Sequence, residues 1–307
     1  MNDKISKIKK FVMNKDYRDL IFFRYNLKNL TDEDVLKKQY RVILNKELDL
    51  KNPSTFNEKI QWLKLNDRKG IYTQLVDKYE VRKFIAENIG EKYLIPIIGI
   101  WDSADDIEFE NLPESFVLKC NHNSGKGMYI CKDKSKINKK QWKKICKNLN
   151  DGLKQDYYKT KMEWPYKNVK RKIVCEKYMV ESKNEDLKDY KLFLFNGKVK
   201  YIQVDFDRFT NHHRNFYSTN WEYVPFTTAY PTNPEKKIEK PNNLSEMIKI
   251  AEKIAERIYL PAFLRVDLYN IQGEIYFGEI TFYHGAGNER FYPEDYDLKL
   301  GKMIKIV

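Results

Sequence analysis

Two stretches of this 307-residue sequence carry residue types and spacings that suit phosphate chemistry. The first, "FVLKCNHNSGKGMYIC" (116–131), places Lys119 at the end of an apolar run and Lys126 in a loop with two glycines. Glycines let backbone N–H groups approach an anion closely, and a lysine adds positive charge. The segment is neither a Walker loop, which opens a helix, nor a GxGxxG turn. A glycine-tipped hairpin with surface lysines is the alternative interpretation.

The second stretch, "RVDLYNIQGEIYFGEIT" (265–281), has carboxylates inside two otherwise apolar runs. If three residues form the turn, Asp267 lies opposite Glu279, whereas a slip of one residue turns them to opposite faces. Thr281 is two positions from Glu279 and shares its face. Oxygen ligands on one sheet face suit Mg²⁺ bound together with phosphates. Pairing of the carboxylates with Arg265 or a lysine is the alternative.

A zinc site is a weaker interpretation. The four cysteines (Cys120, Cys131, Cys146 and Cys175) form no CxxC pair, and His122 has no second metal-ligand pair to complete a site. We therefore expect reduced, buried thiols. The first residues lack the long apolar core of a signal peptide, so we expect a cytoplasmic protein.

The formal net charge of +13 favours anionic partners. The lysines are spread along the chain and no nucleic-acid-binding motif is present, so we expect no nucleic-acid partner. The basic, apolar start "KISKIKKFV" (4–12) suits peripheral contact with the inner face of a membrane. An ordinary packed helix is the favoured interpretation of the same residues.

Helices are expected over the first quarter of the chain. Residues 1–75 have helical patterns, with a cap at Thr31 and a capping box from Thr55 to Glu58. A longer amphipathic helix is expected over 72–90, ending at Gly90.

Strand patterns follow, and most of them come as hairpins. Asn196-Gly197 is a strong hairpin turn. The expected elements are a buried strand in 93–101, strands at 116–120, 128–131 and 171–180, a helix at 138–152, hairpins at 190–207 and 263–282, and a helix from Ser245. Residues 209–243 are expected to be the least structured. The class is α+β rather than Rossmann or TIM, which require strand–helix alternation throughout.

The order of these parts resembles the ATP-grasp superfamily, and more specifically the TupA-like ATP-grasp family of teichuronopeptide and surface-polysaccharide biosynthesis. The resemblance rests on "NPSTFNEKIQWLKL", "LVDKYEVRKFI", "FVLKCNHNSGKG", "DYKLFLFNGK", "RVDLY" and "IYFGEITF". It implies an ATP-grasp fold, in which two α+β subdomains clasp ATP. Residues 1–75 would replace the usual preceding domain, and residues 76–307 would form the ATP-grasp domain. Its flap subdomain would span about 115–180 and its metal-binding subdomain about 181–307.

The resemblance also implies site residues for ATP. Lys78 would reach ATP from a helix, and Lys119 would contact the α-phosphate. The backbone of Lys177 and Met179 would meet adenine, with Glu176 or Glu181 nearby. The mobile flap over the phosphates would be Asn123, Ser124, Gly125, Lys126 and Gly127.

The remaining implied residues serve the reaction. Lys191 would lie near the γ-phosphate, and Asp267 and Glu279 would bind Mg²⁺. Thr281 stands where the superfamily usually has a metal-binding Asn. Residues that would grip substrate or the transferring phosphate are Arg208, Arg265, His284 and Arg290.

The resemblance implies an ATP-dependent carboxylate–amine ligase that works through an acyl-phosphate. It would join an amino acid or amine to a uronic-acid carboxyl of an anionic glycan precursor, free or lipid-linked. Three alternatives stay open: a kinase of a sugar or lipid hydroxyl, a glycosyltransferase, and a non-catalytic module that binds anionic polymer. A glycosyltransferase would need a DxD motif, and Asp205–Asp207 has only the spacing.

Overall fold

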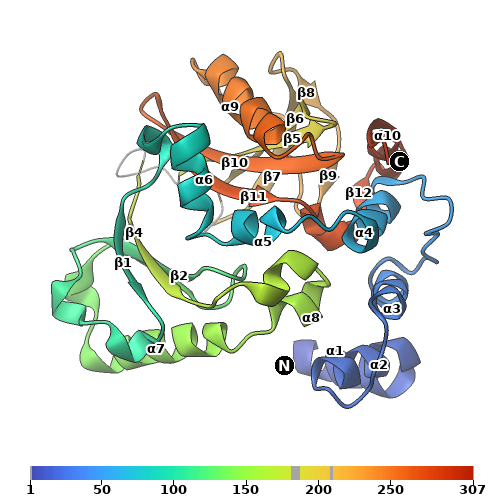
Figure 1. Cartoon of the computed structure of the whole chain (residues 1–307), viewed down its shortest axis with the longest axis horizontal. Coiled ribbons are helices and arrows are strands. Elements are labelled where there is room, and N and C mark those ends of the chain that lie inside the picture. The colour runs from blue at the N-terminus through green and yellow to red at the C-terminus, as the bar shows by residue number, and fades with distance from the viewer. Residues whose placement is uncertain (1, 181–186, 208–209, 307) are drawn as a thin grey trace.

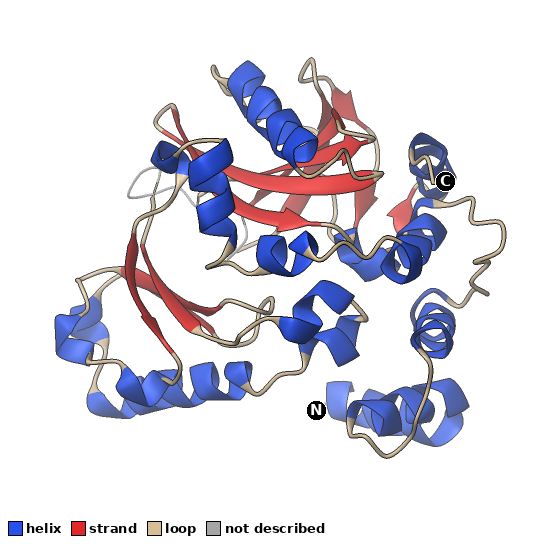
Figure 2. Cartoon of the chain, viewed as in Figure 1, coloured by secondary structure: helices blue, strands red, loops and turns tan. Residues whose placement is uncertain are grey.

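The computed structural model of the chain describes residues 2–180, 187–207 and 210–306 (Figure 1). Glu181 and Arg208 therefore lie outside the described residues. Helices at the N-terminal side come first, and two separate antiparallel sheets follow (Figure 2). The predicted α+β class is confirmed.

Ten α-helices are present in the described residues, and several begin with side-chain caps that the sequence predicts. Thr31 and Thr55 each form a capping box, with Asp34 and Glu58 respectively. The helices are α1 (Asn2–Met13), α2 (Lys15–Arg24), α3 (Asp32–Leu44), α4 (Phe56–Asn66), α5 (Ile71–Val76), α6 (Val81–Asn88), α7 (Lys139–Leu153), α8 (Tyr157–Lys161), α9 (Leu244–Arg257) and α10 (Asp295–Met303).

The smaller sheet has the strand order β1-β4-β2-β3. Its strands are β1 (Ile97–Trp101), β2 (Phe116–Cys120), β3 (Met128–Cys131) and β4 (Ile173–Lys177). One face packs on α7, where Phe116, Leu118 and Cys175 are fully buried. Because side chains alternate along a strand, Val117, Lys119 and Glu176 lie on the opposite face.

The larger sheet has the strand order β11-β10-β5-β6-β7-β8. Its strands are β5 (Asp189–Phe195), β6 (Lys198–Phe206), β7 (His213–Ser218), β8 (Tyr223–Val224), β10 (Phe263–Ile271) and β11 (Glu274–Thr281), and a separate pair joins β9 (Thr227–Thr228) to β12 (Phe291–Tyr292). The helix α9 covers one face of the larger sheet, and the smaller sheet lies on the other side (Figure 1).

Four expectations need correction. The helix expected over 72–90 is two helices, α5 and α6, separated by the turn 77–80 that carries Lys78. In the run 93–101 only Ile97–Trp101 form a strand, β1, whose residues are partly exposed because it is an edge strand, and Leu94 makes an isolated bridge to Phe277. The helix α9 begins at Leu244, after Asn243, with no side-chain cap.

The fourth correction concerns 209–243, which contains β7 and joins the larger sheet. Arg214, Asn215 and Phe216 on β7 are buried, so this segment is a structured part of the sheet. Its Asn and Thr residues are divided between turns and strands, since Asn215 lies on β7 and Thr227 and Thr228 form β9.

Candidate active site

A cleft of about 510 Å³ lies between the two sheets and gathers residues from both. Many of the predicted ATP residues meet there, although they are up to 200 positions apart in the sequence. Those that line the cleft are Lys78, Lys119, Asn123, Ser124, Gly125, Glu176, Lys177, Met179, Lys191, Asp267 and Glu279.

The smaller sheet contributes an apolar surface with one ion pair. Val117 and Ile130 line the cleft beside Ile95, and the chain at 177–179 forms its rim. Lys119 Nζ lies 2.6 Å from a carboxylate oxygen of Glu176, within this apolar surface. The arrangement combines a flat apolar slot with a cation at one end, which suits a planar heterocycle joined to an anionic group.

The glycine loop that follows β2 has a buried base and an exposed tip. Asn121 donates to Asp77 Oδ1 and to Lys170 O, both at 2.9 Å, and Asn123 and its neighbour His122 are also buried. Ser124, Gly125 and Lys126 are exposed. Hydrogen bonds and burial therefore hold the start of the loop in place, whereas the tip of the loop is exposed.

The two glycines of this loop have different roles. Gly125 has a φ of 85°, has open space around it and lines the cleft. Gly127 does not line the cleft. A Cβ there would lie 2.6 Å from Cys120 Sγ and 2.9 Å from Gly152 Cα, so its lack of a side chain serves packing against α7.

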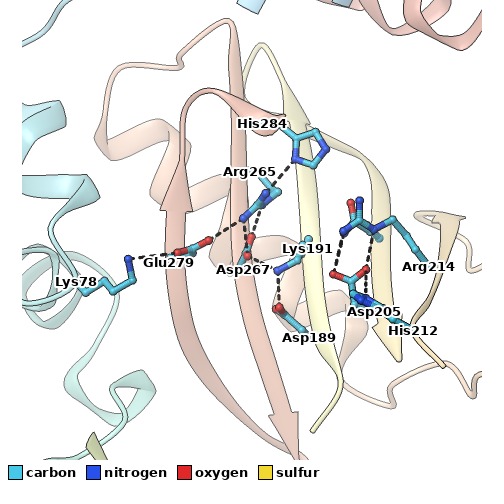
Figure 3. A network of polar contacts seen from close by, with 11 residues as sticks. Lys78, Asp189, Lys191, Asp205, His212, Arg214, Arg265, Asp267, Glu279 and His284 are labelled. Carbon is cyan, nitrogen blue, oxygen red and sulfur yellow. Dashed lines mark hydrogen bonds and ion pairs between the residues drawn. The ribbon is translucent and has the colours of Figure 1, made fainter. Parts of the chain in front are cut away.

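Lys78 reaches the cleft from the turn between α5 and α6. Its Nζ donates to Asn123 O at 2.7 Å and lies 3.9 Å from Glu279 Oε2. Burial lowers the pKa of Lys78, and Glu279 partly offsets this effect. Lys78 thus connects the glycine loop of the smaller sheet with the acidic face of the larger one (Figure 3).

The larger sheet presents a row of charged side chains to the cleft. Lys191 is paired in register with Asp267 on β10, and their side chains form an ion pair of 2.6 Å. A second ion pair joins Lys191 to Asp189. Burial alone would lower the pKa of Lys191, but Asp189 and Asp267 together raise it.

Glu279 joins this row through a β-bulge rather than through the three-residue turn that the pattern required. The turn at Gln272-Gly273 has two residues, since Ile271 pairs with Glu274. The register then shifts between Phe277 and Glu279, which leaves Gly278 as the extra residue and places Glu279 opposite Asp267.

Arg265 lies at the centre of the acidic hairpin. Its Nε and Nη2 donate to the two oxygens of Asp267 at 2.6 and 2.8 Å, and Nη2 also donates to Glu279 Oε1 at 2.8 Å. Burial would raise the pKa of Asp267, but Arg265 and Lys191 hold it below its usual value. Arg265 therefore holds both predicted metal ligands in place (Figure 3).

His284 contacts both Arg265 and Glu289 through its two ring nitrogens. Its Nδ1 lies 3.0 Å from Arg265 Nη1, and its Nε2 lies 3.1 Å from a carboxylate oxygen of Glu289. A guanidinium can only donate, so Nδ1 must be the unprotonated acceptor and Nε2 must carry the proton. His284 is thus neutral, in agreement with a pKa that burial lowers.

The carboxylates beside the cleft are the oxygen ligands that Mg²⁺ prefers. Asp267 and Glu279 line the cleft, and Glu279 Oε2 lies 3.9 Å from Lys78 Nζ. The carboxylates of Asp189, Asp267 and Glu279 are balanced by Lys191, Arg265 and Lys78. Oxygen ligands beside a cleft fit Mg²⁺, but this balance favours a cation that arrives with anionic phosphates.

Six predicted residues in the described part of the chain do not line the cleft: Lys126, Gly127, Arg265, Thr281, His284 and Arg290. Thr281 pairs with Arg265 on the neighbouring strand and is not among the cleft-lining residues, so its role as a metal ligand stays a prediction. Lys126 is exposed at the loop tip. Arg290 donates to Ile43 O at 3.1 Å and lines a separate pocket of about 430 Å³.

Several cleft residues were missed in the sequence. Asp189 precedes Lys191 by two positions, but it follows Lys188 at the start of β5, so no apolar run marks it as one marks Asp267. His212 and Tyr230 line the far end of the cleft with stacked rings 3.7 Å apart. Their segment was expected to be irregular, so nothing in the pattern placed them there.

Comparison with known proteins agrees with this geometry. The family model of TupA-like ATP-grasp proteins matches residues 58–305, so the chain belongs to the TupA-like ATP-grasp family. Its fold is therefore the ATP-grasp fold, as predicted. No curated protein matches.

Solved structures that are similar to the chain include three ligases. D-alanine–D-alanine ligase from Bacillus anthracis has 19% identity and a TM-score of 0.42, with 68% of this chain and 57% of that chain covered. The enzyme of the same name from Helicobacter pylori has 17% identity and a TM-score of 0.43, with 83% and 70% covered. L-amino acid ligase from Bacillus licheniformis has 12% identity and a TM-score of 0.48, with 90% and 63% covered.

No helix among the described residues is both long and apolar enough to span a bilayer. The same residues contain no group of three or more His, Cys, Asp or Glu side chains arranged as a metal site.

Proposed function

We propose that the protein is an ATP-dependent carboxylate–amine ligase. The observation that carries the proposal is the convergence of Lys119, Lys191, Asp267 and Glu279 on one cleft. Phosphoryl transfer needs cations beside the phosphates and a held metal, and little covalent chemistry from the protein. The similar structures include a D-alanine–D-alanine ligase complexed with ATP and a biotin carboxylase domain complexed with MgADP, which is consistent with the same nucleotide here.

In this proposal adenine occupies the apolar slot of the smaller sheet, against Val117 and Ile130 and beside the backbone of Lys177 and Met179. The phosphates extend past Lys119 toward Lys191. The free tip of the glycine loop closes over them and keeps water away from the reacting groups.

Asp267 and Glu279 are the residues that would hold Mg²⁺, which neutralises charge on the phosphoryl oxygens when it is bound. Arg265 keeps the two carboxylates on one face and balances their charge before nucleotide enters. Lys191, buried between Asp189 and Asp267, is held charged and directed at the position of the transferred phosphoryl group.

The reaction has two steps. An oxygen of the substrate carboxylate attacks the γ-phosphorus, the bond to the β,γ-bridging oxygen breaks, and ADP leaves. An amine then attacks the carbonyl carbon of the acyl-phosphate, the carbon–oxygen bond to phosphate breaks, and the departing phosphate takes up the proton that the amine loses. The products are an amide, ADP and phosphate, so atoms and charge balance.

For the substrates we propose a uronic-acid carboxyl of an anionic surface-glycan precursor and an amino acid or amine. The net charge of +13 supports an anionic acceptor. The ring of Tyr230, 41% exposed and stacked on His212, offers a flat surface for a sugar at the far end of the cleft. We further propose that the reaction takes place in the cytoplasm, with the basic first helix α1 in peripheral contact with the inner membrane face.

The test is product analysis with the full chain. ATP, Mg²⁺, uronic acids with their nucleotide-linked forms, and pooled amino acids and amines are incubated together. ADP and phosphate released only when both carboxylate and amine are present, with a mass gain that matches condensation, would support the ligase. A phosphorylated product without amine dependence would instead support the kinase.

The glycosyltransferase alternative would need the carboxylates of Asp205 and Asp207. Asp205 forms an ion pair of 2.7 Å with Arg214, and Asp207 forms one of 2.7 Å with Lys236. A sugar nucleotide would have to compete with these cations for both carboxylates. A non-catalytic binding module would show no ADP formation under any condition and full polymer binding by Asp267→Asn.

A further inference from the structure

The loop that carries His284 has a backbone that needs outside support. Three consecutive residues have positive φ: Gly285 (57°), Ala286 (54°) and Gly287 (63°). A non-glycine residue in this region costs about 1–2 kcal/mol, so the conformation of Ala286 must be stabilised by its surroundings. A Cβ at Gly285 would lie 2.2 Å from Glu289 Cγ, which shows how tightly the loop folds on itself.

The support comes from α4, more than 200 positions earlier in the chain. Gln61 donates to Ala286 O at 3.1 Å and to Gly287 O at 2.8 Å, and Lys64 donates to Ala286 O at 2.6 Å. These carbonyls belong to the strained residues themselves. Their partners on α4 therefore stabilise the conformation that sequence preference alone would disfavour.

Asn57 completes the contact with the end of the loop. Its Nδ2 donates to Glu289 O at 2.8 Å, and its Oδ1 accepts from Glu289 N at 3.2 Å. Positions 57, 61 and 64 share one face of a helix because they are four and three residues apart. That face is fully buried, and all three side chains contact this loop, although Asn57 also donates to Asp297 and Lys64 also donates to Lys161 O.

The burial of Lys64 indicates that these three side chains of α4 do more than fill space. Its side chain is 1% exposed, and within the described chain its ammonium donates to two backbone carbonyls, those of Ala286 and Lys161. Burying a charge is costly, and burial lowers the pKa of Lys64, although Glu163 opposes this effect. A methionine would fill the same space without that cost, so the donor itself is what the position provides.

We propose that Asn57, Gln61 and Lys64 are positioning residues for Arg265, acting through the loop 284–289. The contacts run from α4 to the loop, from Glu289 to His284 at 3.1 Å, and from His284 to Arg265 at 3.0 Å. Arg265 in turn holds Asp267 and Glu279. The helix α4 thus sets the geometry of the acidic hairpin through this loop.

The significance for catalysis rests on the proposed function, whereas the geometry can be tested without any substrate. The probe is the tautomer of His284 in the full chain labelled with ¹⁵N-histidine. The chain has four histidines, and His284→Gln assigns the signal. Long-range ¹H–¹⁵N spectra distinguish a single Nε2-protonated tautomer from an exchanging mixture.

The variants are Gln61→Leu and Lys64→Met, and the matched control is Lys59→Met. Lys59 also lies on α4 and also donates to a carbonyl, that of Ile304 at 2.8 Å, but it does not contact the loop. We expect wild type and Lys59→Met to show the single tautomer, and Gln61→Leu and Lys64→Met to lose it. An ADP-release assay would then fall on the order of 10²-fold, with unchanged affinity for a non-hydrolysable ATP analogue.

Retention of the single tautomer in folded Gln61→Leu and Lys64→Met would overturn the proposal. Loss of the tautomer in Lys59→Met would also overturn it, because the effect would not be specific to the loop. Unfolding of Gln61→Leu, the milder variant, would show that this face serves the fold rather than the position of Arg265. None of these readouts depends on turnover, so failure of the ligase proposal would leave them interpretable.

Discussion

Arg265 and Glu279 lie on neighbouring strands, and Nη2 of the arginine donates to Oε1 of the glutamate at 2.8 Å. The bulge at Gly278 creates this contact by shifting the register of β11. The same guanidinium donates to Asp267 through two nitrogens, so one planar group holds both carboxylates. The acidic hairpin is therefore organised around a cation before any nucleotide enters.

Arg265→Lys should remove this organisation while keeping the charge. An ammonium cannot span both oxygens of Asp267 and also reach Glu279 and His284. We expect turnover to fall on the order of 10²-fold and nucleotide affinity to change little. Steady-state ADP release and binding of a non-hydrolysable ATP analogue measure the two effects, and equal turnover in both proteins would contradict the role.

Glu279→Gln should abolish most turnover and leave the fold intact. The amide keeps the shape of the side chain but loses the charge beside Lys78 and Arg265. We expect a loss on the order of 10²–10³-fold, and Arg265 remains paired with Asp267. Glu274→Gln, at the exposed start of the same strand, is the control. A folded, fully active Glu279→Gln protein would remove the metal assignment.

Magnesium should bind with nucleotide and only weakly alone. Three carboxylates and three cations already balance at the hairpin, so an added divalent ion is unfavourable until phosphates bring negative charge. Calorimetry with Mg²⁺ alone, and then with Mg²⁺ and an ATP analogue, tests this order. Tight binding of Mg²⁺ to the free chain would contradict the balance described.

Acid should destabilise the protein through His122. Its Nε2 donates to Gln155 O at 3.1 Å, and burial lowers its pKa from 6.5 to about 4. The unfolded chain takes up this proton at a higher pH than the folded chain does. The stabilisation is thus complete above about pH 6.5 and is lost as pH falls toward 4.

The full shift corresponds to about 2 kcal/mol at pH 5, which solvent screening reduces to about 1 kcal/mol. Urea unfolding at pH 7 and pH 5 measures the loss. His122→Gln keeps a donor for Gln155 O and has no titrating ring, so it should lose about 1 kcal/mol less than wild type. Equal losses in the two proteins would exclude His122 as the acid-sensitive group.

Much of the cleft could be predicted because its chemistry is local. Lys119 ends a strand beside a glycine loop, and Asp267 and Glu279 interrupt apolar runs, so each is visible within a short window. The capping box at Thr55 and the Asn196-Gly197 turn are likewise signals that span a few residues, and the structure confirms both.

The parts that could not be predicted depend on contacts distant in sequence. The pattern of β11 does not mark the bulge at Gly278, and at the break before Lys78 the Asp77 carboxylate accepts from Tyr79 N, Glu80 N and the distant Asn121 Nδ2. Asn57, Gln61 and Lys64 look like surface positions of an ordinary helix until the loop 284–289 covers them. His212 could not be predicted because the hydrophobic residues of its segment follow no clear helical or strand periodicity.

The most direct test of the account is binding of a non-hydrolysable ATP analogue with Mg²⁺ to wild type and to Lys119→Ala. The account predicts binding by wild type and an affinity about ten- to a hundredfold lower in the variant, since a charged contact to phosphate is lost. Lys136→Ala, whose side chain is 81% exposed outside the cleft, should match wild type. No binding by folded wild type, or equal affinity in Lys119→Ala, would contradict the assignment of this cleft to ATP.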